Sequence, residues 1–550
     1  MSDIKHIIET ALSYQRAGKL AEAELIYKRV LEIEPKHPDA IHLLGMVAFG
    51  RKNYGEAVRF VNEAILLNPK EADYHLNLSS IYLASNQHAL AKSHAKIAAR
   101  LNPLMSEAHY NLGNALFAEG NIEDSISVYQ RALDLDPNNQ SIWSNYLFAY
   151  NFLKKTTSKE IFKINREWGL LLEDKIKKEP QFTFPQSTRR RLKIGYYLPE
   201  LDTHVTIRYL SPVLAIHNKI KFEVIGYGNM ADNKPTPPEI IELFNQWTDI
   251  NGFSAEEIAK EMRGDQIDIL LHPCTFKSRY RGILAYRAAP IQIACTNLVS
   301  TTGLVATDYL ITDEFISPVN SDESIYTEKL IRLSSFNTYK QFPELKRPGR
   351  LPAAENGFIT FGSFNNVAKI NSEVIITWAE ILRRVGNSRI FLKHRSFDAA
   401  DHRIHIIDAF SRTGITPDRL VFEGFTPNRS DYLRVYDQID IALDPFPFGG
   451  GTVSYEALWM GVPILTIAGQ KFMGRLTGSL MCQLGLSDWV TESKDQYIST
   501  AKSMVNDLSN LWDLRQHLRI NAQNTIFNAK KHVLELEMAL ESVWENYIDQ

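Results

Sequence analysis

A proline recurs every 34 residues near the start of the chain, at Pro35, Pro69, Pro103 and Pro137. Small residues recur in the same register, 24, 12 and 5 positions before each proline. Small side chains at these positions let the two helices of a hairpin approach closely, and each proline ends the second helix. The spacing therefore predicts stacked helical hairpins throughout residues 1–150.

A 34-residue period with this pattern is the signature of tetratricopeptide (TPR) repeats, which stack into a superhelix with a concave groove. Such a groove predicts a surface that binds a peptide or a protein, and dimerisation through the repeats is compatible with it. The alternative is an array that only self-associates or acts as a spacer. Four polar residues of the repeats, Asn77, His109, Asn111 and Asn114, either bond a peptide backbone or form a solvated face.

Composition limits the class of protein. A chain of 550 residues is too long for one core and indicates several domains. The net charge of -3 gives no field that favours nucleic acid or an anionic membrane. Three widely spaced cysteines exclude a disulfide framework and fit a reducing compartment. A signal peptide and a long apolar run are both missing from the sequence, so the expected location is the cytoplasm.

Two boundaries divide the rest of the chain. Residues 151–190 have the pattern of a capping helix followed by a polar linker. Strand-like and helix-like segments then alternate in residues 191–346, and they alternate again in residues 347–550, which end in helices. The predicted fold class is thus a TPR α-solenoid followed by two Rossmann-like, doubly wound α/β domains. Tandem domains of this type hold a ligand in the cleft between them, beyond the carboxyl ends of the strands.

Three consecutive glycines, Gly449, Gly450 and Gly451, follow a predicted strand and precede a predicted helix. Glycines at a helix start let backbone N–H groups close on an anion, and the helix dipole adds partial positive charge there. Thr452 either caps the helix or donates to a phosphate oxygen, and Glu456, one turn later, is placed to accept from ribose hydroxyls. The alternative is a plain strand-to-helix turn, because the pattern is neither a Walker A loop nor a GxGxxG motif.

Two further loops carry candidate residues at strand ends. Lys369 follows the first predicted strand of the second α/β domain and can neutralise a diphosphate, while Asn365 and Asn366 can bond a nucleotide. His204 and Arg208 follow the first predicted strand of the first α/β domain and share one helix face. His204 can act as a base, an acid or a sugar contact, although a lone histidine is more often structural.

The order of these segments resembles one known family. The TPR array is followed by the sequences at 195–214, 286–313, 361–370 and 444–469, and this series is similar to the O-GlcNAc transferases. These are TPR-containing glycosyltransferases of the two-Rossmann (GT-B) type, with bacterial members and plant SPINDLY-like O-fucosyltransferases. The resemblance implies an inverting transferase that needs no metal or other cofactor. It would move a sugar, expected to be GlcNAc, from a UDP-sugar to Ser or Thr of a protein.

The resemblance also implies roles for individual donor-side residues. Lys369 matches a lysine that contacts the diphosphate, and Thr452 matches a threonine that contacts phosphate. Glu456 replaces the aspartate that holds the ribose, and Asn366 stands at a uridine-contacting glutamine. These matches make the glycine turn the diphosphate end of a nucleotide-sugar site.

Other matching positions are altered. Thr426 and Asn428 stand where the family contacts uracil, but the family's base-stacking lysine is missing there. His204 matches a histidine of the acceptor-side cleft. The family's Gly-His-Thr segment is absent, and His272 and Lys277, which lie near its place, are the candidates to substitute for it. Arg208 is a further candidate on the acceptor side. These changes leave the donor sugar and the acceptor open.

The implied chemistry requires charge stabilisation on the leaving diphosphate and removal of a proton from the acceptor hydroxyl. The glycine turn, its helix dipole and Lys369 would take the diphosphate charge, which removes the need for a metal. The proton passes to His204 or to a donor phosphate oxygen, and the sequence does not choose between them. Two other functions remain open: transfer to a glycan or small molecule, and a non-catalytic TPR scaffold with a degenerate transferase domain.

Overall fold

The structure is a computed structural model. It describes residues 2–176, 182, 191–199, 201, 205–230, 234–273, 281–295, 300–345 and 349–549. The chain forms two compact units, Met1–Ala149 and Tyr150–Gln550, which are described separately. Within the described residues, no helix combines the length and the apolar composition that crossing a membrane requires.

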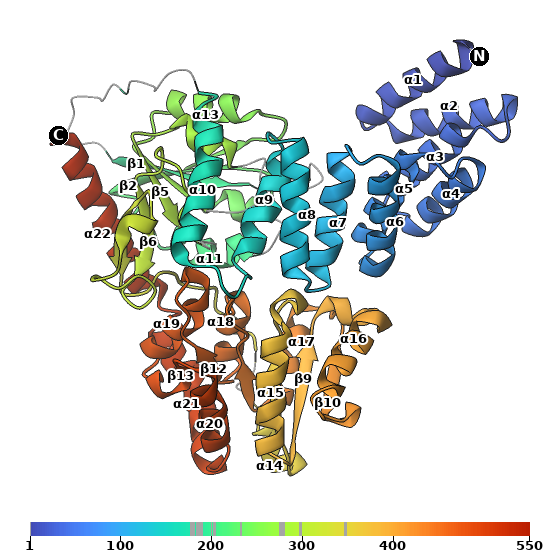
Figure 1. Cartoon of the computed structure of the whole chain (residues 1–550). Helices are drawn as coiled ribbons and strands as arrows, with labels where there is room; N and C mark the ends of the chain where they lie inside the picture. The colour runs from blue at the N-terminus through green and yellow to red at the C-terminus, as the bar shows by residue number, and fades with distance from the viewer. Residues whose placement is uncertain are drawn as a thin grey trace. The chain divides into compact units, whose positions relative to one another are not determined.

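The first unit is an array of helical hairpins (Figure 1). Its helices are α1 (Ser2–Arg16), α2 (Leu20–Ile33), α3 (Pro38–Gly50), α4 (Tyr54–Leu67), α5 (Ala72–Ala84), α6 (His88–Leu101), α7 (Ser106–Ala118), α8 (Ile122–Leu135) and α9 (Gln140–Tyr150). Each repeat proline lies in the loop that follows the second helix of a hairpin. The repeat fold predicted from the 34-residue spacing is therefore confirmed.

Small residues are required where paired helices touch. A Cβ added at Gly113 would lie 2.5 Å from the Tyr129 ring, and one added at Gly45 would lie 2.8 Å from Val61. Atoms this close overlap, so a larger residue would force the packed helices apart. In the third hairpin Ser79 takes this place, and its hydroxyl donates to a carbonyl of the partner helix at 2.9 Å.

The four polar residues singled out on the repeats all have partners inside the first unit. The bonds join Asn77 to His42 (2.9 Å), His109 to the Pro103 carbonyl (3.1 Å), Asn111 to Ser80 (2.8 Å), and Asn114 to Tyr129 (2.8 Å) and Asn145 (2.7 Å). These side chains tie neighbouring segments of the array together.

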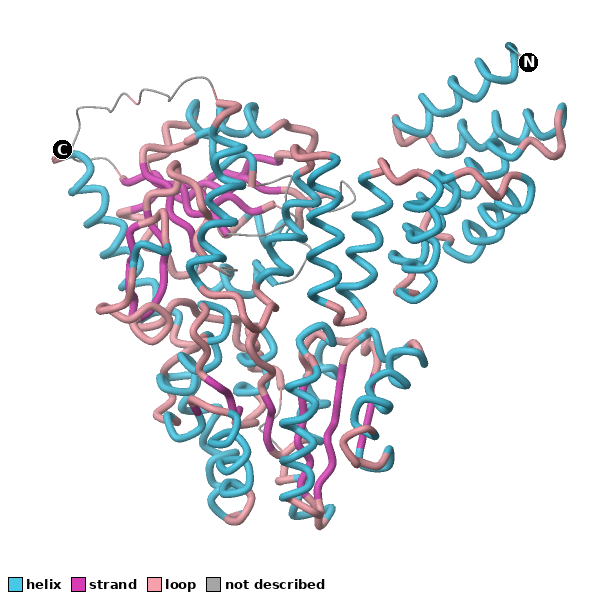
Figure 2. The backbone as a smooth tube through the Cα atoms, in the orientation of Figure 1, coloured by secondary structure: helices cyan, strands magenta, loops and turns pink. Residues whose placement is uncertain are grey.

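The second unit contains α10 (Ser158–Glu173) and two parallel sheets (Figure 2). The first sheet has the order β3-β2-β1-β4-β5-β6-β7, and with its helices it forms the N-terminal lobe. Its elements are β1 (Leu192–Leu198), α11 (Val205–Leu214), β2 (Phe222–Gly228), α12 (Pro238–Ile241), β3 (Gln246–Asp249), α13 (Ala255–Gly264), β4 (Ile269–Pro273), β5 (Ile291–Cys295), β6 (Tyr309–Asp313) and β7 (Lys329–Leu333). The strand order reverses beside β1, which is where this kind of sheet opens a crevice.

The second sheet has the order β10-β9-β8-β11-β12-β13 and belongs to the C-terminal lobe. Its strands are β8 (Ile359–Ser363), β9 (Ser388–Lys393), β10 (Leu420–Glu423), β11 (Ile441–Leu443), β12 (Ile464–Ile467) and β13 (Val490–Thr491). The helices are α14 (Pro352–Asn356), α15 (Ser372–Arg384), α16 (Ala400–Ser411), α17 (Arg429–Arg434), α18 (Thr452–Trp459), α19 (Leu476–Gln483), α20 (Lys494–Met504) and α21 (Leu508–Asn524). The two parallel Rossmann-like sheets confirm the predicted fold class.

The last helix, α22 (Ala529–Ile548), returns to the first sheet (Figure 1). Its buried residues Val533, Leu536 and Leu540 share a hydrophobic core with Ile194 and Leu271 of the N-terminal lobe. Residues 347–550 therefore do not form one lobe, as the alternation pattern suggested, because their final helix buries its apolar face against the other sheet. The chain crosses between the lobes twice.

Candidate functional site

Two loops that are far apart in the sequence meet at the carboxyl ends of β8 and β11, which are neighbours in the sheet. Lys369 ends the short 3-10 turn that follows β8, and its ammonium donates to the Gly449 carbonyl at 2.6 Å. The same ammonium lies 3.4 Å from Asn365 Oδ1. The structure thus brings the lysine loop and the glycine turn, which the sequence singled out separately, into one cluster.

The glycine turn is shaped by Asp444, the first residue after β11. Its carboxylate accepts from the Gly450 N–H at 2.6 Å and from the Thr466 hydroxyl at 2.8 Å. Burial raises the pKa of Asp444, whereas these hydrogen bonds and the positive charge of the nearby Lys369 lower it. A Cβ added at Gly450 would lie 2.1 Å from the Ser454 hydroxyl, so this tight turn requires glycine there. Gly451 is the N-cap residue of α18, and a Cβ there would meet open space.

Lys369 is held in a partly dry environment. Its ammonium lies 4.3 Å from the centre of the Phe448 ring, in addition to its bonds with the two loops. Burial lowers the pKa of Lys369 to about 8, and the negative charge of Asp444 opposes this shift. The lysine is therefore mostly protonated at neutral pH and can neutralise an anion that enters beside the glycine turn.

Glu456 lies one turn into α18 and is almost completely buried. It pairs with Arg208 at 3.4 Å and with Arg429, and it accepts from the hydroxyls of Tyr339 and Tyr432, each at 3.2 Å. Both carboxylate oxygens thus have protein partners. Because the side chain is almost completely buried, a ribose could reach this carboxylate only if neighbouring side chains moved.

The same face of α18 joins the two lobes. Arg208 and Tyr209 come from α11 of the N-terminal lobe, and Tyr209 Oη lies 3.4 Å from Thr452 Oγ1. Thr452 and Glu456 are four residues apart, so they share one helix face and meet two consecutive residues of α11. Thr452 is the first residue of α18 and makes no capping bond, and the cap position belongs to Gly451. Arg208, expected on the acceptor side, contacts the C-terminal lobe here.

The two expected uracil contacts follow β10. Thr426 Oγ1 accepts from the buried Lys393 ammonium at 2.6 Å and donates to Glu423 at 3.1 Å. Asn428 caps α17, because its side-chain oxygen accepts from the N–H groups of residues 430 and 431. Lys393 also donates to Glu423 at 2.7 Å. Thr426 thus sits in a charged network that the sequence reasoning missed, whereas Asn428 is occupied in a local cap.

Asparagine side chains serve as caps in the lysine loop as well. Asn366 accepts from the Ala368 N–H at 3.0 Å and caps the 3-10 turn Val367–Lys369. Asn365 is buried and its amide donates to Ser363 at 3.3 Å. Asn366 is exposed, and its side-chain oxygen shapes the turn. A local cap and a nucleotide contact were both compatible with the sequence, and the structure shows the cap.

The acceptor-side candidates have different outcomes. His204 and Lys277 lie outside the described residues. His272 is at the end of β4 with no exposed surface, 3.5 Å from the Thr307 hydroxyl, and burial lowers its pKa to about 3. His272 is therefore a neutral core residue of the N-terminal lobe and offers no surface to an acceptor.

The model for glycosyl transferase family 41 matches residues 150–340 and 350–536. The chain belongs to this family. Two tetratricopeptide repeat models match residues 14–80 and 76–140 of this family 41 chain.

Relatives of this family 41 chain include plant and bacterial proteins. A rice (Oryza sativa subsp. japonica) protein named probable UDP-N-acetylglucosamine--peptide N-acetylglucosaminyltransferase SPINDLY is 32% identical over 434 residues, covering 77% of this chain and 46% of the relative. The Arabidopsis thaliana protein of the same name is 31% identical, covering 75% of this chain and 46% of the relative. The chain thus spans less than half the length of these curated relatives. A mutant of Thermobaculum terrenum O-GlcNAc transferase superposes with a TM-score of 0.80 at 31% identity, covering 99% of this chain and 98% of that one.

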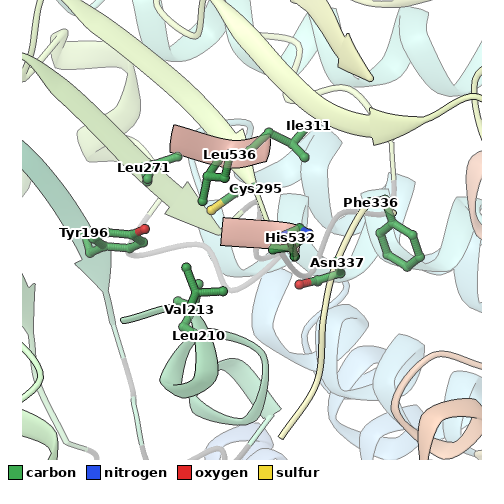
Figure 3. A pocket seen from close by; sticks show the side chains of 10 residues that line it. All are labelled: Tyr196, Leu210, Val213, Leu271, Cys295, Ile311, Phe336, Asn337, His532 and Leu536. Atoms are coloured by element: carbon green, nitrogen blue, oxygen red, sulfur yellow. The ribbon is translucent and has the colours of Figure 1, made fainter. Parts of the chain in front are cut away.

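The N-terminal lobe of the family 41 chain contains a cavity (Figure 3). It lies between the carboxyl ends of the first sheet, α11 and α22, and its lining includes Leu271, Cys295 and Leu536. Its polar groups are Tyr196, Asn337 and His532, and burial lowers the pKa of His532 to about 4. No residue lining this cavity belongs to the cluster around Lys369. It is a mostly apolar space in the lobe core.

Proposed function

We propose that this family 41 protein transfers N-acetylglucosamine from UDP-N-acetylglucosamine to serine or threonine side chains of proteins. The observation that carries this proposal is the meeting of Lys369 with the glycine turn at the start of α18. The name of the bacterial relative, an O-GlcNAc transferase, supports the choice of sugar.

The cluster is suited to bind the diphosphate of a nucleotide sugar. The first turn of α18 directs backbone N–H groups and the positive end of its dipole toward the Gly449–Gly451 turn. The Lys369 ammonium would exchange its bond with the Gly449 carbonyl for a phosphate oxygen. Positive charge held in place before the reaction stabilises the charge that develops on the leaving diphosphate.

The transfer that we propose is a single displacement with inversion. The acceptor oxygen forms a bond to C1 of the sugar while the bond from C1 to the diphosphate oxygen breaks, and the electron pair leaves with UDP. The acceptor proton passes to His204 or to a donor phosphate oxygen, and both routes remain part of the proposal. No metal takes part in this scheme, so activity should persist in a chelator such as EDTA.

We also infer that the TPR unit binds the protein acceptor. The groove of stacked hairpins is the surface that such arrays use for peptides. Self-association through the repeats and a cytoplasmic location are further predictions. Gel filtration coupled to light scattering tests the first, and fractionation of cells tests the second.

A panel of nucleotide sugars tests the proposal. Hydrolysis of each UDP-sugar and GDP-sugar is measured first, and transfer from the active donors to proteins, glycans and small molecules is measured next. We expect hydrolysis of UDP-N-acetylglucosamine and transfer to protein. Transfer only to glycans or small molecules would replace the acceptor in the proposal. No hydrolysis of any donor and no nucleotide binding would favour a non-catalytic scaffold.

A further inference from the structure

The segment that precedes the two lobes reaches the candidate donor site. Phe152 lies two residues after the end of α9 and stacks on Phe448, with ring centroids 4.4 Å apart and ring planes inclined by 27°. Phe448 comes directly before the glycine turn, and its ring lies 4.3 Å from the Lys369 ammonium. Both phenylalanines are buried. A continuous series of contacts therefore runs from Phe152, outside the lobes, through Phe448 to Lys369.

Neighbouring residues fix Phe152 to the C-terminal lobe. Lys154 forms an ion pair with Glu373 in the first turn of α15. The Lys471 ammonium donates to the Leu153 carbonyl. The backbone on the C-terminal side of Phe152 is thus attached at two points, so its ring has a defined place against Phe448.

The same segment is attached to the N-terminal lobe further along. The Arg166 guanidinium donates to the Gly303 carbonyl at 2.9 Å, and the Glu173 carboxylate accepts from the Val305 N–H at 2.7 Å. A Cβ added at Gly169 would lie 2.1 Å from the Gly303 carbonyl oxygen, which shows how closely α10 approaches this lobe. Residues 152–173 are therefore bonded to both lobes, and within this segment Phe152 makes the contact with the donor site.

We propose that Phe152 is a positioning residue of the donor site, which packs against Phe448 and thereby holds the ring on which the Lys369 ammonium rests. This inference depends on the proposed role of Lys369 in binding the diphosphate. An ammonium above an aromatic ring is attracted by the ring's electron density, and the attraction weakens when water enters or the ring moves. Stacking by Phe152 prevents both changes.

A positioning role and a purely structural role predict different pH dependence. Among the described residues, Asp444 is the charged group that acts on Lys369, and its negative charge raises the pKa of the lysine. Glu373 on α15 is paired with Lys154. Removal of the Phe152 ring admits water beside the ammonium, so burial depresses the pKa of Lys369 less. Because the protonated lysine binds the diphosphate, affinity falls as the pH rises through this pKa. The pH at which affinity is lost therefore rises when Phe152 is truncated, and a loss of fold stability alone would not move it.

Four variants of the full chain test the inference. Phe152→Ala removes the ring, Phe152→Leu removes it while keeping most of the volume, and Phe152→Tyr keeps it. Lys154→Ala is the matched control, because it removes one exposed ion pair of the same segment while the bond from Lys471 to the Leu153 carbonyl still holds Phe152 against Phe448. Binding of UDP and of GDP is measured by calorimetry from about pH 7 to about pH 10, where a perturbed lysine titrates. Thermal unfolding checks that each variant is folded.

We expect Phe152→Ala to weaken binding of the tighter-binding nucleotide, UDP or GDP, by about 3–10-fold at neutral pH and to raise the pH at which that binding is lost. Phe152→Leu, which keeps most of the volume, should show smaller changes in the same direction. Phe152→Tyr and Lys154→Ala should bind within about twofold of the wild-type chain. Wild-type affinity and an unmoved pH profile in Phe152→Ala would overturn the inference, and so would equal losses in Lys154→Ala.

A fifth variant, Lys369→Ala, separates this inference from the proposed function. If Lys369→Ala binds as well as the wild-type chain, the diphosphate role of the lysine is wrong and the inference falls with it. If Lys369→Ala loses binding while the Phe152 variants keep both affinity and pH profile, only the positioning role of Phe152 is wrong.

Discussion

Replacing Glu456 by glutamine tests the charge cluster that joins the two lobes. The carboxylate side chain is 2% exposed, and its charged partners are Arg208 at 3.4 Å and Arg429. Glutamine has nearly the same shape, so the variant removes the charge and keeps the packing. Two guanidinium groups then share a site of low dielectric without a counter-charge, and their desolvation is no longer offset.

The expected cost follows from the burial of the three groups. Breaking a fully buried ion pair by removing one partner costs roughly 3–5 kcal/mol. The Arg208 and Arg429 side chains are 18% and 31% exposed, so solvent screens part of the repulsion. We therefore expect Glu456→Gln to lower the free energy of unfolding by about 2–3 kcal/mol. The control is Glu373→Gln, a 27% exposed carboxylate that pairs with surface lysines, for which we expect less than about 1 kcal/mol.

Urea unfolding of the full-length variants, followed by tryptophan fluorescence, measures this difference. The urea concentrations at the unfolding midpoints are compared with a common m value, because neither substitution changes the surface exposed on unfolding. A loss for Glu456→Gln no larger than that for Glu373→Gln would refute the reasoning. Unchanged stability together with weaker nucleotide binding would instead indicate that Glu456 serves the ribose, as the sequence suggested.

Three further predictions concern single positions. Gly450→Ala should weaken UDP binding at least about tenfold in calorimetry, because its Cβ would overlap a neighbouring hydroxyl, whereas Gly451→Ala faces open space and should stay within about twofold. Gly113→Ala should destabilise the TPR unit by about 1–3 kcal/mol in thermal unfolding through a clash with a buried tyrosine ring, whereas Gly55→Ala meets nothing and should not. In the wild-type chain, kcat/KM for donor hydrolysis should fall as the pH rises through about 8, because Lys369 loses its proton there.

Each of these predictions has a contradicting result. Equal binding by the two glycine variants of the turn would show that its tight geometry does not matter for the nucleotide. Equal thermal stability of the two glycine variants in the repeats would contradict the helix-packing argument. A flat pH profile of kcat/KM up to about pH 10 would show that a lysine with this depressed pKa is not required.

The periodic parts of the fold could be predicted from the sequence. A proline at a fixed spacing ends a helix whatever lies around it, so the repeat boundaries were read directly. Alternating strands and helices likewise imply parallel sheets. The return of α22 to the N-terminal lobe could not be predicted, because an apolar helix face does not specify which sheet covers it.

The candidate site was only partly predictable for a related reason. Lys369 and the glycine turn each follow a strand end, and the sequence therefore placed both at the same edge of a sheet. Arg429 and Lys393 gave no such signal, because their importance arises from partners 27 and 30 residues away. Asn366 and Asn428 gave an ambiguous signal, since asparagine after a strand is typical of both a helix cap and a ligand contact.

Sugar transfer by Lys369→Ala is the most direct test of the central claim that Lys369 and the glycine turn hold the donor diphosphate. Incorporation of N-acetylglucosamine from UDP-N-acetylglucosamine into protein is measured for the wild-type chain, Lys369→Ala and the control Lys154→Ala. Loss of a preorganised charge-stabilising group typically costs about 10²–10³-fold in rate, and we expect a loss of this size for Lys369→Ala alone. Transfer by Lys369→Ala at the wild-type rate would contradict the account.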